Sequence, residues 1–232
     1  MYEEKIALFK KMGVAVLVKI PFTLEFSLKG PEDFVKEILC DSLDTREVFV
    51  GYNYRFGKGR EGNISKLRVL GIKLGFKVVE VNQISIDGEI VSSTKIRNLL
   101  RDGAVEHAAK LLGRHYAITG IVIRGDGRGK AIGVPTANIA PIHEIIPASG
   151  VYAVKLFIRN RYYSGIANVG YRPTFDRNTL TMEVNIFNFD EDIYGEEITL
   201  SFIRKIRDEM KFIDINSLIQ QINLDIETAR KI

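Results

Sequence analysis

The sequence predicts two domains of different class, an α/β domain over residues 1–115 and a β domain over residues 116–232. In the first half, helix-like and strand-like segments alternate, which is typical of βαβ units and an open, largely parallel sheet. In the second half, apolar and polar residues alternate with a period of two, which favours short antiparallel strands in a small barrel or sandwich. The pattern changes near Gly113, Arg114 and His115, where we place the boundary.

Local patterns predict the elements of the first half in turn. A helix that ends at Met12 precedes the apolar run 14–18, which suits a buried parallel strand. Gly30 and Pro31 open a helix that runs to residue 39, with acidic residues in its first turn. The remaining elements are a strand at 48–50, a helix at 65–74, a strand at 77–81, a helix at 95–101 capped by residues 92–94, and a helix at 104–112 ended by Gly113.

The second half reads as strands closed by one helix. Alternation is clearest where Ile198, Leu200 and Phe202 are separated by Thr199 and Ser201. Asn160 lies in a tight hairpin between two strands. The strands are expected at residues 116–124, 151–159, 161–168, 180–189 and 197–204, and the final helix is amphipathic, with Leu218, Ile222, Ile226 and Ala229 on one face.

The composition fits a soluble globular protein, since 46% of the residues are hydrophobic and 27% are charged. No run of about twenty apolar residues occurs, and the N-terminus has no basic start leading into an apolar segment. The single cysteine, Cys40, has no partner for an internal disulfide. We therefore expect a cytoplasmic protein with no membrane partner. The net charge of +4 suits nucleotides as well as nucleic acid, but no basic cluster with interleaved aromatics stands out, so no nucleic-acid partner is expected.

The densest motif is a glycine-rich loop at residues 125–133. Its glycines allow close approach of a ligand, its amides can wrap phosphate oxygens, and two basic side chains add positive charge. It is not a Walker A loop, because only three residues separate two of its glycines and alanine follows the lysine. It is not a Rossmann fingerprint, because it runs into Val134 and Pro135 and not into a helix. The candidate phosphate-binding residues are Gly125, Gly127, Arg128, Gly129, Lys130 and Gly133.

Thr136 and Asn138 follow this loop and are two residues apart, so an extended backbone points both side chains to the same side. A hydroxyl and a carboxamide oxygen are hard, neutral ligands that suit a Mg²⁺ ion carried by nucleotide phosphates. In isolation such a pair more often forms a turn bonded to its own backbone. Beside the glycines and the two cations, the ligand interpretation is favoured.

The pattern Gly-x-Gly-x-Gly-Lys-x-x-Gly-x-Pro-Thr-Ala-Asn at residues 125–138 resembles the signature of bacterial riboflavin kinases, which form the C-terminal half of bifunctional FAD synthetases. The resemblance implies a six-stranded Greek-key barrel flanked by helices, and a kinase that converts riboflavin to FMN with ATP and Mg²⁺. It continues in six ordered blocks at residues 150–153, 167–170, 172–174, 183–185, 192–195 and 207–209.

The resemblance also implies roles for single residues. Thr136 and Asn138 bind Mg²⁺-ATP, and Glu183 is the general base for the 5′-hydroxyl of riboflavin. The local pattern agrees, because strand alternation separates Glu183 from its apolar neighbours, although a lone glutamate on a strand is usually solvated. Arg207 and Asn185 are assigned to the flavin, and Arg207 is equally suited to a surface ion pair with a neighbouring acid.

Residues 1–115 resemble the second part of the FMN adenylyltransferase domain, a nucleotidyltransferase fold, in the blocks 50–58 and 91–97. By that resemblance, Ser93, Thr94 and Arg97 contact ATP phosphates at a helix N-terminus and Asn53 approaches the flavin; the serines also suit a simple N-cap. The family's His-x-Gly-His motif has no counterpart among the three histidines. We therefore expect a partial domain, little adenylyl transfer, and self-association through an exposed apolar sheet edge.

The sequence thus predicts a riboflavin kinase that acts on riboflavin, FMN and ATP and carries a partial adenylyltransferase domain. One alternative is a complete bifunctional enzyme, if the gene product is longer than this chain. Another is a flavin or nucleotide sensor without catalysis, which has no need of Glu183.

Overall fold

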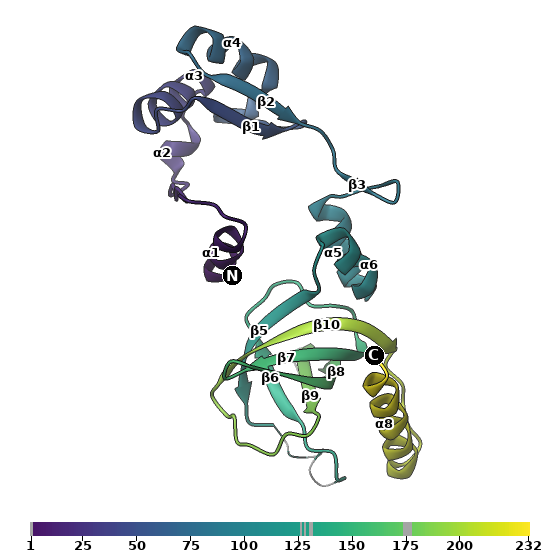
Figure 1. Ribbon diagram of the computed structural model, residues 1–232. Coiled ribbons are helices and arrows are strands. Elements are labelled where there is room, and N and C mark those ends of the chain that lie inside the picture. Colours follow the sequence, from purple (N-terminus) through teal and green to yellow (C-terminus); the bar gives the residue numbers. More distant parts are fainter. Residues whose placement is uncertain (1, 126, 128, 130–131, 174–177) are drawn as a thin grey trace. The chain divides into compact units, whose positions relative to one another are not determined.

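The computed structural model describes residues 2–125, 127, 129, 132–173 and 178–232. It consists of two compact units, Tyr2–Ile90 and Val91–Ile232 (Figure 1). The division lies upstream of residue 115, because the helix α6 (Val105–Leu112) packs against the barrel strands and the helix α5 (Ser93–Arg101) packs on α6 and adds Leu100 to the barrel core. In the described part of the chain, no helix combines the length and apolar character needed to cross a bilayer.

The first unit contains the predicted βαβ arrangement in reduced form. Its strands β1 (Glu47–Gly51) and β2 (Lys77–Val81) pair in parallel, and α4 (Ile64–Leu74) connects them and packs on β2. Leu67 is fully buried in the small core that this helix shares with Val35 and Phe76. The other elements of the unit are α1 (Tyr2–Lys11), α2 (Leu24–Ser27), α3 (Pro31–Asp33), the π-helix η1 (Phe34–Ser42), the 3₁₀ turn η2 (Lys58–Arg60), and the short strands β3 (Ser85–Ile86) and β4 (Glu89–Ile90).

One predicted strand of this unit is wrong. Residues 14–18 are neither helix nor strand, and the side chains of Val16 and Val18 are 77% and 50% exposed. An apolar run becomes a buried strand only where a neighbouring strand accepts its backbone hydrogen bonds, and β1 pairs only with β2 among the described residues. The helix expected to run to residue 39 is present, but most of it has π-type hydrogen bonding.

The second unit is a closed six-stranded barrel with the order β10-β5-β6-β9-β8-β7. Five of its strands coincide with the predicted ones, and the sixth, β6, lies in the motif that follows the glycine loop. The bounds are β5 (Tyr116–Ile123), β6 (Ala137–Pro141), β7 (Gly150–Ile158), β8 (Arg161–Pro173), β9 (Asn178–Ile186) and β10 (Glu197–Arg207), and the chain ends in α8 (Ile215–Arg230). The tight β7–β8 turn is made by Arg159 and Asn160, both with positive φ.

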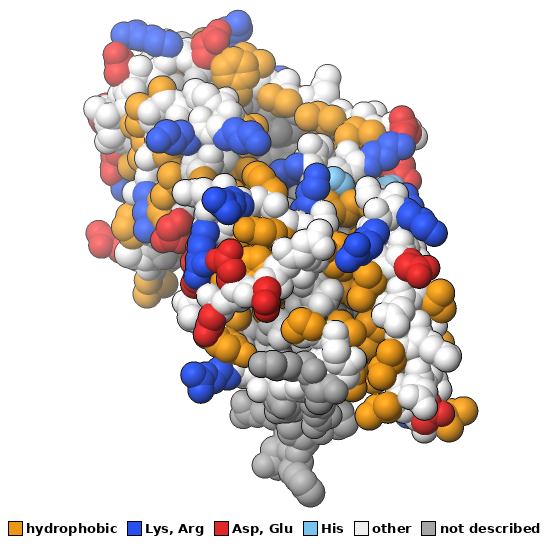
Figure 2. All heavy atoms as spheres, turned by 60° about the horizontal axis from the view of Figure 1, so that its bottom comes forward, with side chains coloured by type: hydrophobic (Ala, Val, Ile, Leu, Met, Phe, Trp, Pro, Cys, Tyr) orange, Lys and Arg blue, Asp and Glu red, His pale blue; other side chains and the backbone are white. Residues whose placement is uncertain are grey.

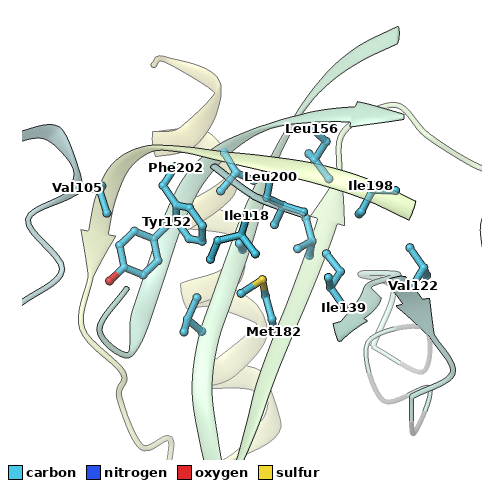
Figure 3. Packing of buried hydrophobic residues seen from close by; sticks show 14 of the residues in the cluster. Val105, Ile118, Val122, Ile139, Tyr152, Leu156, Met182, Ile198, Leu200 and Phe202 are labelled. Carbon is cyan, nitrogen blue, oxygen red and sulfur yellow. The ribbon is translucent and has the colours of Figure 1, made fainter. Parts of the chain in front are cut away.

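Large side chains fill the barrel interior (Figure 3). Tyr152 and Phe202 meet edge to face with ring centroids 5.3 Å apart, and the α6 residue Val105 closes the same core. The predicted alternation in β10 is confirmed, since Ile198 and Leu200 are buried here with Phe202. A second apolar layer covers the outer surface of β7 and β8, where Val151, Ala153 and Ile166 form a cluster with Phe187 and, from α8, Ala229. Because the barrel interior is filled, a ligand site has to lie on its outside.

Candidate functional site

A cavity of about 590 Å³ lies on the outer surface of the barrel beside α8. Polar residues from strands line part of it, and apolar residues of α8 and the segment before it line another part. Its volume is within the usual range for a site that holds a small organic molecule. The polar lining includes Thr136, Asn168, Thr181, Glu183, Asn185, Arg207, Glu209 and Asp225, and the apolar lining includes Val151, Ile166, Met210, Phe212, Ile215, Leu218 and Ile222.

Strand β9 places Glu183 in this cavity. Its neighbours Met182 and Val184 point into the barrel core and are buried, so Glu183 and Asn185 point outward, as alternation requires. Glu183 is paired in register with Asn138 on β6 and with Asn168 on β8. Directly opposed side chains on neighbouring strands have Cβ atoms about 5 Å apart. Glu183 therefore stands between two carboxamides.

The glycine loop packs directly on the two predicted metal ligands. A Cβ atom at Gly125 would lie 2.0 Å from Asn138 Nδ2, and one at Gly129 would lie 2.8 Å from Thr136 Oγ1. Any other residue at these two positions would therefore displace the ligands. Gly127 and Gly133 have φ values of 70° and 79°, in the left-handed region that glycine adopts without strain. The predicted cations Arg128 and Lys130 lie outside the described residues.

Asn185 does more than line the cavity. Its Nδ2 donates a 2.7 Å hydrogen bond to the carbonyl of Pro135, the residue before Thr136. This bond joins β9 to the start of the Thr136–Asn138 segment. It shows Asn185 supporting that segment, whereas sequence reasoning assigned it only to the flavin.

Arg207 lies at the end of β10, after two register shifts that change the direction of this strand. Arg207 pairs with Val151 in the sheet, and Val151 pairs with Asn168. Asn168 in turn pairs with Glu183, so Arg207 and Glu183 belong to one cross-strand row. Its side chain forms an ion pair with Asp225 of α8, which sequence reasoning did not identify. The acid that pairs with Arg207 is therefore close to it in space but is not its neighbour in the sequence.

The described charged residues that line the cavity are mainly acidic. Of its described lining residues, three are acidic and one is basic. Arg207 is paired with Asp225, and Glu183 and Glu209 supply two further carboxylates to the lining. Nearby, the Lys205 ammonium donates a 2.6 Å bond to Asp208 and holds the pKa of that carboxyl below its ordinary value. A polyphosphate enters such a site more readily when a divalent cation accompanies it.

The residues predicted for adenylyl transfer do not share one site within either unit. Asn53 follows β1 in the first unit, whereas Ser93, Thr94 and Arg97 lie on α5 in the second. Ser92 caps this helix by accepting a 3.2 Å bond from the Lys95 amide. The N-cap interpretation is thus observed, and the phosphate-binding role remains a prediction.

Charged side chains of both signs are interspersed with apolar ones on the face shown in Figure 2.

Comparison with known proteins gives consistent matches to flavin enzymes. Residues 112–232 match the family model described as riboflavin kinase, and residues 1–95 match the one described as FAD synthetase. The bifunctional riboflavin kinase/FMN adenylyltransferase of Buchnera aphidicola subsp. Schizaphis graminum is 37% identical over 99% of this chain and 75% of its own length. Its namesake from Bacillus subtilis is 36% identical over 98% of this chain and 72% of its own length.

A solved structure also matches. The crystal structure described as a macrolide-efflux protein from Streptococcus pneumoniae has a TM-score of 0.91 and 32% identity, covering 98% of this chain and 74% of the other. That description disagrees with the family models and the curated relatives, which agree with one another.

Proposed function

Since this chain belongs to the bifunctional riboflavin kinase/FMN adenylyltransferase family, we propose that Thr136, Asn138 and Glu183 form the centre at which its barrel phosphorylates riboflavin. The reaction transfers the γ-phosphoryl group of ATP to the 5′-hydroxyl and gives FMN and ADP. One observation carries the proposal: Glu183 and Asn138 are register partners, and Glu183 lines the same cavity as Thr136.

Glu183 acts as the general base in this proposal. Its carboxylate accepts the proton of the 5′-hydroxyl while that oxygen forms a bond to the γ-phosphorus. The bond between the γ-phosphorus and the β,γ-bridging oxygen breaks, and ADP leaves with the electron pair. Such a transfer depends mainly on positioning and charge neutralisation. The cross-strand hydrogen bonds of β9 to β6 and β8 supply the positioning, because they fix Glu183 against Asn138 and Asn168.

The site fits a nucleotide-bound divalent cation, which we propose to be Mg²⁺. The Thr136 hydroxyl and the Asn138 carboxamide supply neutral oxygen ligands, and the acidic lining favours a cation over bare phosphate. Bound there, the ion neutralises charge on the phosphates. The Pro135–Asn185 hydrogen bond joins the segment that carries the two ligands to β9, and the absence of a Cβ atom at Gly125 and Gly129 leaves room for the ligand side chains.

The apolar part of the cavity fits the flavin ring system. Met210, Phe212, Ile215, Leu218 and Ile222 line it together with Arg207. A large, uncharged aromatic ring gains from the removal of this apolar surface from water. The ribityl chain then extends from this side toward Glu183, where its terminal alcohol reacts.

The direct test is incubation of the purified chain with riboflavin, ATP and Mg²⁺, followed by chromatographic separation of riboflavin, FMN and FAD. We expect FMN to accumulate, with no FMN when either ATP or the divalent ion is omitted. A protein that binds riboflavin and ATP but yields no FMN under these conditions would support the sensor alternative and contradict the kinase proposal.

Adenylyl transfer is the second candidate, because residues 1–95 match the FAD synthetase model. We propose that this chain has little of it. The His-x-Gly-His motif that serves the α-phosphate in the family has no counterpart in this sequence. The same chromatogram decides the question, since sustained conversion of FMN to FAD by this chain would contradict the proposal.

A further inference from the structure

Asp225 is a buried acid that the proposed mechanism does not use. Only 2% of it is exposed, although it lies on α8, a surface helix whose other acidic residue, Glu227, is exposed. A charge is rarely buried unless it is paired and hydrogen-bonded. Asp225 also lines the cavity that contains Glu183.

Two guanidinium nitrogens of Arg207 donate hydrogen bonds to the Asp225 carboxylate. Arg207 Nε lies 2.9 Å from Oδ2 and 3.1 Å from Oδ1, and Nη2 lies 2.8 Å from Oδ2. Gln221 Nε2 donates a further 2.9 Å bond to Oδ1 from the preceding helical turn. The carboxylate is thus held from both its own helix and the barrel.

The guanidinium is fixed on its other sides as well. Arg207 Nη1 donates a 2.9 Å bond to the carbonyl of Asp208, and the Phe212 ring centroid lies 5.7 Å from Cζ. The side chain is only 18% exposed. Arg207, Phe212 and Asp225 therefore form one rigid group that joins the end of β10 to α8 and borders the cavity.

We propose that Asp225 is a positioning residue for riboflavin, which it serves by holding Arg207 as a fixed, charge-neutral wall of the cavity. The inference rests on the proposed function. A guanidinium paired with a buried carboxylate has no net charge to offer a phosphate, but its planar face still stacks on an aromatic ring. The pair therefore favours the uncharged ring of riboflavin at this end of the cavity and leaves the phosphates to the Thr136–Asn138 end.

The test compares steady-state kinetics of the full chain and its Asp225→Asn variant. We expect the KM for riboflavin to rise about ten-fold, which corresponds to about 1.4 kcal/mol of lost binding. The KM for Mg²⁺-ATP should stay unchanged and kcat should change by less than about three-fold, because uniform binding of one substrate is what is lost. Glu227→Gln, on the same helix but exposed, is the matched control and should behave as the wild type.

A double variant separates positioning from structural support. Replacing a buried ion pair by apolar residues often restores stability, so Arg207→Met combined with Asp225→Leu should unfold thermally near the wild-type midpoint. We expect its KM for riboflavin to stay high, because no planar wall is present. Recovery of that KM together with the midpoint would show that the pair is only structural and would overturn the proposal.

The remaining outcomes are equally decisive. If the wild type makes FMN but Asp225→Asn keeps a normal KM for riboflavin, or changes only the KM for Mg²⁺-ATP, the role of Asp225 fails and the kinase proposal stands. If the wild type makes no FMN, both fail together.

Discussion

The two compact units differ in how completely their sheets are paired. In Val91–Ile232 each of the six barrel strands has a neighbour on both sides, and the core is filled by side chains such as Phe202 and Leu200. In Tyr2–Ile90 the parallel sheet has two strands, and apolar side chains such as Phe49 and Val81 are 64% and 43% exposed. The cavity described above belongs entirely to the closed unit.

Closure of the sheet supports the candidate site of the barrel from both edges. Glu183 is held from both sides because β9 has a neighbour at each edge. Strand β1 has one neighbour among the described residues, so a side chain on it is supported from one side only. We therefore expect kinase activity to depend on the second unit and to tolerate damage in the first.

A matched pair of core truncations tests this expectation most strongly. Leu200 and Leu67 are both fully buried, the first in the barrel and the second in the N-terminal unit. Leu200→Ala should destabilise the barrel by about 2–5 kcal/mol and lower the temperature at which kinase activity is lost. Leu67→Ala should leave that temperature unchanged while it loosens its own unit. Heat inactivation of FMN formation measures this temperature for both variants. An equal drop in the two variants would mean that the units do not behave separately.

Within the barrel, Glu183→Gln should have the largest effect on chemistry. The amide preserves shape and polarity but cannot accept the 5′-hydroxyl proton, so we expect kcat to fall by a factor on the order of 10² or more. ATP binding and the thermal midpoint should remain close to wild type. Near-normal turnover in a correctly folded variant would remove Glu183 from the role of base.

Thr136→Val should have a smaller effect, which is confined to nucleotide binding. The substitution keeps the size of the side chain and removes one oxygen ligand while Asn138 remains. We expect the KM for Mg²⁺-ATP to rise about ten-fold, as loss of one interaction of about 1.4 kcal/mol implies, with the KM for riboflavin unchanged. An unchanged KM for Mg²⁺-ATP at several Mg²⁺ concentrations would assign the hydroxyl to packing.

The smallest effect is expected at the open sheet. Phe49 lies on β1 and is 64% exposed, and an exposed apolar strand promotes association with other chains. Phe49→Lys should reduce self-association in light scattering across a concentration series, without changing FMN formation. Equal scattering by the variant and the wild type would place the association surface elsewhere, or show that the chain is monomeric.

Much of the fold was predictable because the patterns were local. Alternation at Ile198, Leu200 and Phe202 identified β10, and Ser92 and Gly113 marked helix ends through their capping chemistry. The strand expected at residues 14–18 failed because its formation depends on a partner strand, which local pattern does not encode. Strand β6 escaped notice because its sequence around Asn138 and Pro141 reads as part of a binding motif.

The candidate site likewise contains residues that local patterns predict and contacts that depend on the fold. Glu183 was predicted from its motif, and the structure confirms the strand alternation that puts it on the opposite side from Met182. Asp225 was missed, although one signal was present: it lies three residues after Ile222, on the apolar face of α8, where an acid is unexpected. Its partner Arg207 was found, but the pairing itself is long-range and needs the fold.

The row formed by Asn138, Glu183 and Asn168 ties the candidate site to correct assembly of the barrel. If β9 slipped by a single position, Met182 would face outward and the Glu183 carboxylate would enter the hydrocarbon interior. A misaligned molecule would thus lose both the proposed base and the packing of its core. The specific activity of a preparation should consequently be proportional to the fraction of molecules whose strands are correctly aligned. The rate of FMN formation can therefore be used to measure the refolding yield.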